Sequence, residues 1–262
     1  MPNMKLATWN VNSIRARLPR VIQFLEQHAP DVLCVQETKC DPGAFPHPEL
    51  AAAGYRAVDH STGRWAGVAI IAREDHALTD VVRGLPGSPL PEEGRWVEAS
   101  VAGVRVASVY VINGRSLDDD MYPAKLAFLD AMAAWSAGLG DASRVVGGDF
   151  NIAPADIDVY DPSAFVGATH VSPPERERLQ ALLATGLVDA FRRVEPETVQ
   201  HTWWDYRAGN FHKGLGLRID LVLASRPLAD GLRACGIDRD FRKGPKPSDH
   251  APVIAEFTRW PA

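Results

Sequence analysis

The chain has 262 residues, of which 46% are hydrophobic, so it can bury a full core. Its formal net charge of -5 disfavours a protein that coats nucleic acid through bulk positive charge, but it allows an enzyme that gathers carboxylates at a metal site. We find no basic start followed by a long apolar stretch and no run long enough to cross a bilayer, so we expect a soluble, cytoplasmic protein.

The first half of the chain is predicted to consist mainly of strands. Residues 18–28 are the exception, because their apolar side chains follow the spacing of one helical face. Ala102-Gly103 predicts a tight hairpin between two neighbouring strands. The expected strands are residues 5–10, 31–35, 68–71, 96–101 and 104–110.

The second half alternates helices and strands. Helices are expected over residues 122–137 and 173–185, and the latter has prolines at its start and Gly186 at its end. Strands are expected over residues 144–148, 219–223 and 252–257. Hairpins mixed with strand and helix units favour an α/β or α+β layered domain, with mixed β-sheets covered by helices.

Cys34, Cys40 and Cys235 form an odd set without the spacing of a zinc site. Cys34 lies within an apolar run, so we expect buried or free thiols. None of the three is assigned to the chemistry.

Four motifs rich in acidic and amide side chains are predicted to follow apolar runs, and strand ends are where a sheet brings ligands together. Because these motifs extend from Asn10 to His250, we predict a single catalytic domain over residues 1–262. Carboxylates, amides and one His suit phosphodiester hydrolysis with Mg²⁺ or Mn²⁺. The motifs are Trp9-Asn10, Gln36-Glu37-Thr38-Lys39, Gly147-Gly148-Asp149-Phe150-Asn151 and Ser248-Asp249-His250.

Glu37 is the predicted principal metal ligand, because it follows a strand and precedes a loop. The alternative is an ion pair with Lys39 at the rim of the sheet. Asn10 is expected to contact metal or phosphate, with a turn residue as the alternative.

Asp149 and Asn151 are two residues apart, so both can point the same way from an extended segment. Asp149 could then orient or deprotonate the attacking water, and Asn151 could hold a phosphate oxygen. The alternative is an ordinary Gly-Asp turn.

Asp220 places a charge in an apolar strand, which is costly unless the charge has a partner. We predict that it accepts a hydrogen bond from His250, whose other ring nitrogen then faces the phosphate. The alternative partners are Arg218 or a backbone amide. Asp249 is expected to reach the metal directly or through water.

Aromatic and basic residues form the remaining candidates. The Tyr110 hydroxyl is expected to donate to the scissile phosphate, unless Tyr110 is a core residue. Trp203-Trp204 suits a wall around an unstacked nucleotide or sugar, although one of the two could belong to the core. Arg115 is expected to touch the DNA backbone, with an ordinary hairpin loop after Tyr110 as the alternative. Candidate phosphate contacts, each with a solvated surface as the alternative, are Arg15, Arg17, Arg20, Arg207, Arg242, Lys243 and Lys246.

With these residues, the chain resembles the exonuclease III family of bacterial apurinic/apyrimidinic endonucleases, within the endonuclease/exonuclease/phosphatase superfamily. The resemblance implies a four-layer sandwich of two mixed sheets flanked by helices. It also implies incision 5′ of abasic sites, trimming of blocked 3′ ends and 3′-to-5′ degradation of duplex DNA. The segments that carry it are residues 8–17, 36–39, 147–154, 201–207, 217–225 and 248–252.

The resemblance also implies roles for individual residues, with double-stranded DNA as partner and a monomeric state. The implied catalytic residues are Tyr110, Asp149, Asn151, Asp220 and His250. The implied ligands of Mg²⁺, or of Mn²⁺, are Asn10, Glu37, Asp149, Asn151, Asp249 and His250. The implied DNA or sugar contacts are Asn12, Arg15, Lys39, Arg115, Trp203, Arg207, Leu217 and Ile219.

Two other functions remain open at this point. One is a phosphoesterase of the same superfamily that acts on a small molecule or lipid. The other is a damaged-DNA binding protein without catalysis, which the cluster of carboxylates disfavours because carboxylates repel phosphate.

Overall fold

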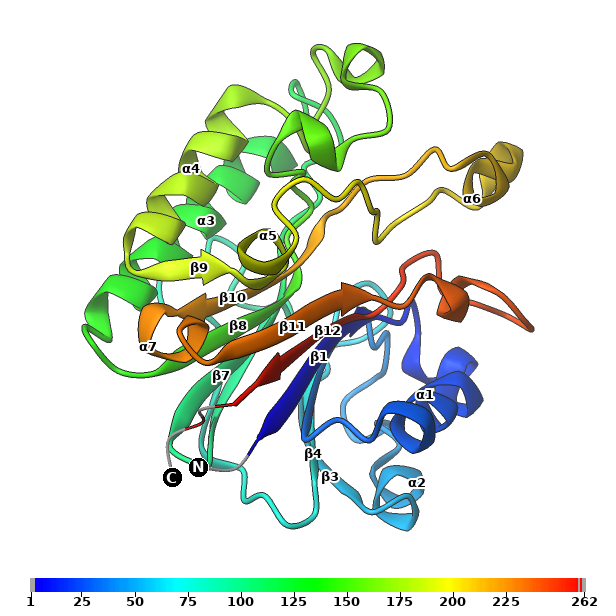
Figure 1. The fold of residues 1–262 in the computed structure, drawn as a ribbon, viewed down its shortest axis with the longest axis vertical. Coiled ribbons are helices and arrows are strands. Elements are labelled where there is room, and N and C mark those ends of the chain that lie inside the picture. Colours follow the sequence, from blue (N-terminus) through cyan, green and yellow to red (C-terminus); the bar gives the residue numbers. More distant parts are fainter. Residues whose placement is uncertain (1–2, 259, 261–262) are drawn as a thin grey trace.

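The computed structural model describes residues 3–258 and 260, and contains two mixed six-stranded sheets that face each other (Figure 1). The first sheet has the order β11 (Leu232–Ile237), β12 (Val253–Phe257), β1 (Met4–Asn10), β2 (Val32–Gln36), β4 (Val68–Arg73), β3 (Tyr55–His60). The second has the order β5 (Thr79–Arg83), β6 (Trp96–Val101), β7 (Val104–Tyr110), β8 (Arg144–Asp149), β10 (Asp220–Ser225), β9 (Leu187–Asp189).

Helices cover the outer face of each sheet (Figure 1). α1 (Ile14–His28) and α2 (His47–Ala52) pack on the first sheet, whereas α3 (Met121–Gly138) and α4 (Pro173–Ala184) pack on the second. The other helices are short: α5 (Ala190–Val194), α6 (Asn210–Lys213), α7 (Arg226–Ala229) and the 3₁₀ segments Asp156–Asp158, Pro162–Phe165, Arg207–Gly209 and Arg239–Arg242.

A hydrophobic core fills the space between the sheets. Leu6 and Ile70 of the first sheet are fully buried in one cluster with Val106 and Val222 of the second. Burial of each such side chain contributes about 1.5–3 kcal/mol. The predicted four-layer sandwich of two mixed sheets and flanking helices is therefore confirmed.

Every predicted strand and helix is present, and several have shifted ends. α1 begins at Ile14 rather than at residue 18, because the Ser13 hydroxyl caps the helix by accepting from the Ala16 amide. The hairpin at Ala102-Gly103 joins β6 to β7 as predicted. Strands β3, β5, β9 and β11 were not predicted. β3, β5 and β11 contain exposed residues that break the apolar pattern, and β9 has only three residues.

Strand register brings the polar motifs to one edge of the two sheets. Asn10 is paired with Gln36, and Asp149 lies between Tyr110 and Asp220 on its two neighbouring strands. The motif containing His250 was expected to follow a strand, but it precedes β12. It still reaches the same edge, because β12 runs antiparallel to β1.

The second glycine of the Gly-Gly-Asp motif has a packing role. A Cβ atom at Gly148 would lie 2.1 Å from the carbonyl oxygen of Val109 on the neighbouring strand. A larger residue would push β7 and β8 apart directly beneath Asp149.

The three cysteines are buried and free, as expected. Burial raises the pKa of Cys34 to about 12 and that of Cys40 to about 11. Among the described residues, no helix has both the length and the apolar character needed to cross a membrane.

Candidate active site

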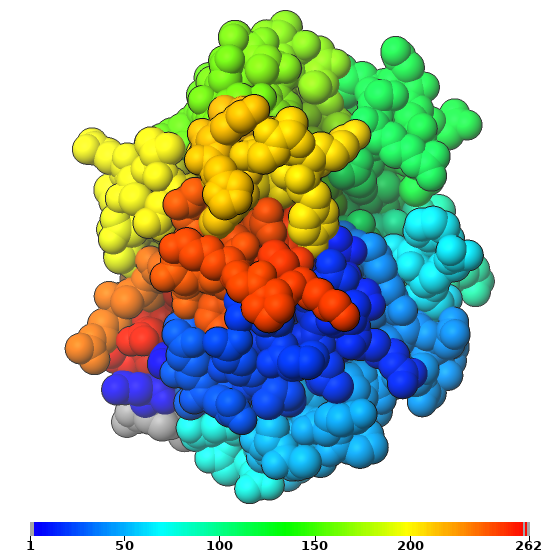
Figure 2. All heavy atoms as spheres, turned by 90° about the vertical axis from the view of Figure 1, so that its right-hand side faces the viewer, coloured from blue at the N-terminus to red at the C-terminus, as the bar shows by residue number. Residues whose placement is uncertain are grey.

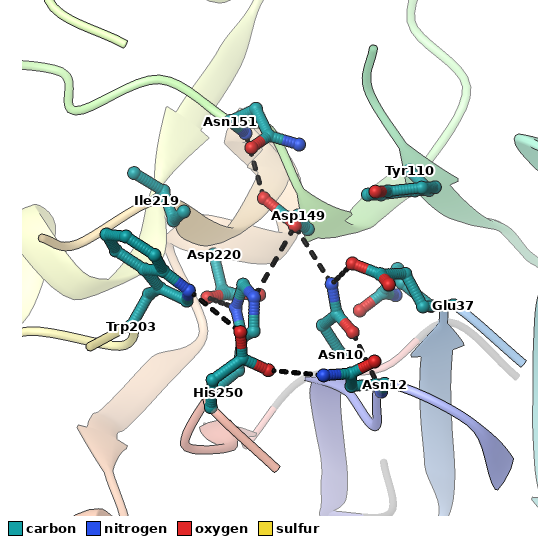
Figure 3. A network of polar contacts seen from close by, with 12 residues as sticks. Asn10, Asn12, Glu37, Tyr110, Asp149, Asn151, Trp203, Ile219, Asp220 and His250 are labelled. Carbon is teal, nitrogen blue, oxygen red and sulfur yellow. Dashed lines mark hydrogen bonds and ion pairs between the residues drawn. The ribbon is translucent and has the colours of Figure 1, made fainter. Parts of the chain in front are cut away.

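The polar motifs converge on one pocket of about 190 Å³ at the shared edge of the sheets (Figure 3). Asn10 and Glu37 reach it from the ends of β1 and β2, and Tyr110 and Asp149 from the ends of β7 and β8. The residues that line it are Glu37, Tyr110, Asn113, Asp149, Asn151, His170, Trp203, Ile219, Asp249 and His250. Each sheet thus supplies part of the site.

Glu37, Asp149 and His250 offer ligand atoms that lie within 4.8 Å of one another, close enough to hold a metal ion. The side-chain amide of Asn10 joins the two carboxylates, since Nδ2 donates to Glu37 Oε1 at 2.8 Å and to Asp149 Oδ2 at 3.0 Å. Glu37 also forms the ion pair with Lys39, at 2.7 Å. The alternative interpretation of Glu37, an ion pair with Lys39, is therefore confirmed, and its role as the principal metal ligand stays a prediction.

Asp249 lies in the pocket but outside this group of three ligand atoms. Its Oδ1 accepts from Asn12 Nδ2 at 3.0 Å, and its Oδ2 accepts from Trp203 Nε1 at 3.1 Å. Lys39 Nζ donates to the Asn12 side chain at 2.6 Å. These bonds fix Asp249 at the pocket wall, and its predicted contact with metal stays a prediction.

Asn151 is held from three sides. Its backbone amide donates to Asp149 Oδ1 at 2.9 Å, and its Nδ2 donates to the Val111 carbonyl at 2.9 Å. Its Oδ1 accepts from Asn113 Nδ2 at 3.1 Å. The two amide side chains therefore form a linked pair beside Asp149.

The predicted contact between Asp220 and His250 is confirmed, with 2.8 Å between Oδ2 and Nδ1. Because the carboxylate accepts, Nδ1 carries a proton and Nε2 points towards Asp149, 3.8 Å from its Oδ2. The alternative partner, Arg218, instead binds Asp158 at 2.6 Å and Asp189 at 2.8 Å.

Burial and neighbouring charges shift the pKa values of the central groups. Burial, followed by the charge of Asp220, raises the pKa of Asp149 to about 7. Burial disfavours the charged form of His250, but Asp220 and Asp149 outweigh it and raise its pKa to about 10. Burial and the nearby carboxylates of Glu37 and Asp149 raise the pKa of Tyr110 well above its usual value. Near neutral pH, His250 is a cation and Tyr110 a protonated donor.

Five of the site residues that the resemblance implies adopt left-handed backbone conformations, which cost a non-glycine residue roughly 1–2 kcal/mol. Such strain is concentrated at functional sites in proteins. The residues and their φ angles are Asn12 (47°), Glu37 (51°), Lys39 (49°), Arg115 (53°) and Asn151 (52°).

The predicted sugar-pocket residues lie together. Trp203 and Ile219 line the pocket, and Leu217 is fully buried beside them in one apolar cluster. Trp204 is 2% exposed and belongs to the core, so the two tryptophans have different surroundings, as the sequence allowed.

Three of the predicted DNA contacts are exposed. Arg15 is exposed, and the side chains of Arg115 and Arg207 are 70% and 88% exposed. The loop with residues 205–214, the loop with residues 239–250 and the start of α1 lie side by side on the face shown in Figure 2. Hydrogen bonds from Tyr206 to the Pro247 carbonyl and from Arg17 to Tyr206 join them.

The expectation for Arg242 is wrong. Its side chain is buried, with the guanidinium over the rings of Tyr206 and Phe211, and it donates to the Ser248 carbonyl. It holds the loop before His250 instead of facing solvent.

Two pocket residues were not predicted, Asn113 and His170. Asn113 lies three residues after the end of β7, and its position in a loop after a strand was a usable signal. His170 lies in a segment without helical or strand periodicity, so no sequence pattern indicated it. Burial and then Lys125 lower its pKa to about 4, and its Nδ1 donates to the Asn151 carbonyl at 2.6 Å.

Comparison with known proteins identifies relatives of this chain. Residues 7–250 match the model of the Endonuclease/Exonuclease/phosphatase family. Exodeoxyribonuclease III of Haemophilus influenzae is 32% identical over 97% of this chain and 100% of its own length. The 3′ phosphatase NExo from Neisseria, solved with a product DNA hairpin, is 41% identical with a TM-score of 0.94, over 98% of this chain and 100% of that one.

An AP endonuclease from Archaeoglobus fulgidus is as similar in fold to this chain as the Neisseria enzyme is. It is 36% identical, with a TM-score of 0.94, over 98% of this chain and 100% of its own. The family match over most of the chain and the full-length relative show that this chain belongs to the Endonuclease/Exonuclease/phosphatase family, and within it to the exodeoxyribonuclease III nucleases.

Proposed function

We propose that this protein is a metal-dependent DNA repair nuclease that hydrolyses phosphate esters at the 3′ ends of duplex DNA and the phosphodiester 5′ of abasic sites. The observation that carries the proposal is the convergence of Glu37, Asp149 and His250 within 4.8 Å, beside Tyr110 and Asn151. The named activities of the relatives support it, since they include a 3′ phosphatase and an AP endonuclease.

The donor set fits a hard divalent cation. Glu37 and Asp149 offer carboxylate oxygens, and Asn10 and Asn151 add amides nearby, which suits Mg²⁺ with Mn²⁺ as a substitute. When bound, such an ion offsets the negative charge of the phosphate. His250 is better suited to the phosphate than to the ion, because its raised pKa keeps it protonated.

Each proposed reaction breaks the bond between phosphorus and the 3′ oxygen. Asp149, with its pKa near 7, accepts the proton of the attacking water and is held by Asn10 and the Asn151 amide. His250, fixed by Asp220, donates from Nε2 to a phosphate oxygen, and the Tyr110 hydroxyl donates to another. The departing 3′ oxygen takes up a proton from solvent water and becomes a 3′ hydroxyl. One arrangement therefore serves end trimming, phosphate removal and incision.

We propose that an apolar pocket and several exposed arginines recognise the DNA substrate. Trp203, Leu217 and Ile219 form an apolar wall that suits a deoxyribose without its base. We propose that the exposed Arg15, Arg115 and Arg207, together with Asn12 and Lys39, contact the DNA backbone.

We further propose that residues 1–262 form one catalytic domain that acts as a monomer in the cytoplasm. The pairing of β1 with β12, from opposite ends of the chain, supports the single domain. Light scattering after size-exclusion chromatography measures the monomer directly.

The test uses three labelled duplexes, with an internal abasic analogue, a 3′-phosphate end and a recessed 3′-hydroxyl end. Each is incubated with Mg²⁺, Mn²⁺ or EDTA, and Asp149→Asn is the matched inactive control. We expect metal-dependent hydrolysis that the variant lacks, and the three rates rank the activities. No product with either metal contradicts the proposal and directs the search to phosphoinositides and to binding without cleavage.

A further inference from the structure

Lys125 of α3 is a fully buried cation that lies behind the active site. Its Nζ donates to the carbonyl oxygens of Asn113 at 3.1 Å and Asn151 at 2.7 Å, to Thr169 Oγ1 at 3.2 Å and to Glu175 Oε1. Lysine is almost never fully buried without a partner. Two of its acceptors are backbone atoms of residues that line the catalytic pocket.

Glu175, at the start of α4, balances this charge and is itself satisfied. Its Oε1 accepts from Thr169 Oγ1 at 2.7 Å and from the His170 amide at 3.0 Å. Its Oε2 accepts from the amide and the hydroxyl of Ser172, at 2.9 Å and 2.6 Å. The Lys125–Glu175 pair thus joins two helices to the loops that carry Asn113, Asn151 and His170.

The pair fixes the two amide side chains through their backbones. The Asn151 carbonyl accepts from both Lys125 and His170, and Asn151 has a left-handed φ of 52°, a conformation that needs such support. The loop after Asn113 lies directly on the lysine, since a Cβ atom at Gly114 would be 3.1 Å from Lys125 Cδ. The linked side-chain amides of Asn113 and Asn151 are thereby held beside Asp149, which accepts from the Asn151 backbone amide.

We propose that Lys125 is a positioning residue for the hydrolytic reaction, which acts by holding the Asn113 and Asn151 amides in register with Asp149. The inference rests on the proposed function for its kinetic test, but its structural content can be tested without DNA. Displacement of a positioned group by about 1 Å can cost roughly 100-fold in rate.

The competing account is a brace that only stabilises the fold, and Arg144 is the matched control for it. Arg144 is also buried, and it donates to the carbonyls of Gly140, Ala142 and Thr185 at 2.7, 3.0 and 2.6 Å. It lies at the start of β8, whereas Asp149 is at the end of that strand. Arg144 therefore joins the same layers without contact with the pocket.

The experiment compares Lys125→Met/Glu175→Gln with Arg144→Met. The double substitution avoids leaving Glu175 as an unpaired buried charge, which could prevent folding. At equal folded fraction by circular dichroism, we expect the double variant to lose about 10- to 100-fold in kcat on 3′-phosphate DNA, with KM within about 3-fold. Arg144→Met should keep kcat within about 2-fold while its Tm falls.

A second measurement follows the side-chain amide NMR signals of Asn113 and Asn151 in the protein without DNA. In the double variant, we expect these signals to shift and the two side-chain amides to become less ordered. Neither change is expected in Arg144→Met. Unchanged signals, or equal kcat losses in the two variants, overturn the proposal. If the wild-type protein cleaves no DNA, the proposed function fails, while the NMR comparison still decides the role of Lys125.

Discussion

Arg218 and Asp220 are separated by one residue but belong to two buried clusters with opposite electrostatic character. Arg218 joins Arg192, Asp158 and Asp189, so two cations meet two carboxylates. Asp220 joins Asp149 and Glu37, where His250 is the buried cation and Lys39 is at the rim. We call the first the balanced cluster and the second the acidic cluster.

The two clusters differ in how well their charges are satisfied. In the balanced cluster, Asp158 and Asp189 outweigh burial and raise the pKa of Arg218 further. In the acidic cluster, burial and Asp220 raise the pKa of Asp149 to about 7, and Asp220 Oδ1 has no hydrogen-bond partner among the described residues. The acidic cluster thus keeps an excess of negative charge at the place where a cation is expected to bind. In the balanced cluster, the two arginines compensate the two carboxylates.

The largest expected effect is that of Asp149→Asn. Turnover should fall by about three orders of magnitude or more, because the variant cannot accept a proton from water. The Tm without metal should not fall, since an unfavourable buried charge is removed. Single-turnover cleavage and thermal melts measure the two quantities, and turnover near the wild-type value would remove Asp149 from the chemistry.

Arg218→Met tests the opposite behaviour in the balanced cluster. It leaves Asp158 and Asp189 with excess charge, so the free energy of unfolding should drop by about 3–5 kcal/mol. The folded fraction should keep its cleavage rate. Urea unfolding and activity normalised to folded protein check this, and a stable but inactive variant would contradict the division between the clusters.

Glu37→Gln removes one carboxylate from the acidic cluster and keeps its shape. We expect the Mg²⁺ concentration for half-maximal cleavage to rise roughly 10-fold. Substitution of even a residue that only supports a metal ligand typically lowers metal affinity by at least this factor. Maximal turnover at saturating Mg²⁺ should change less. An unaltered metal titration would exclude Glu37 as a ligand.

The smallest effect concerns acid stability. The pKa of His170 is about 4 in the folded protein, below its ordinary 6.5, so the unfolded chain binds more protons between these values. Stability from this group is present above pH 6.5 and is lost as the pH falls towards 4. His170→Gln should reduce the acid-induced fall in Tm over that window by several degrees. His212→Gln, at an exposed histidine, is the control and should leave the slope unchanged.

The two clusters also show what a sequence can predict. The partnership of Asp220 with His250 was predictable, because a carboxylate in an apolar strand needs a partner and few candidates existed. The convergence of Asn10, Glu37 and Asp149 followed from their positions at strand ends. The strands themselves were predictable from apolar runs, except where exposed residues interrupted the pattern or, as in β9, the strand has only three residues.

The contacts behind the pocket were not predictable in the same way. Lys125 meets Asn113, Asn151 and Glu175 only because three loops and two helices fold onto one point. Nothing local in the sequence distinguishes Lys125 from a surface lysine of a helix. Likewise, the burial of Arg242 depends on the rings of Tyr206 and Phe211, which come from another loop.

The division of the pocket between the two sheets has a consequence for how the protein fails. Asn10 and Glu37 come from one sheet and Tyr110 and Asp149 from the other, so no single sheet holds a working set. A small slip at the interface between the sheets would separate the catalytic atoms while nearly all strand and helix hydrogen bonds remained intact. During heating, cleavage activity should therefore be lost at a lower temperature than the circular dichroism signal. Activity is then the more sensitive measure of partial unfolding.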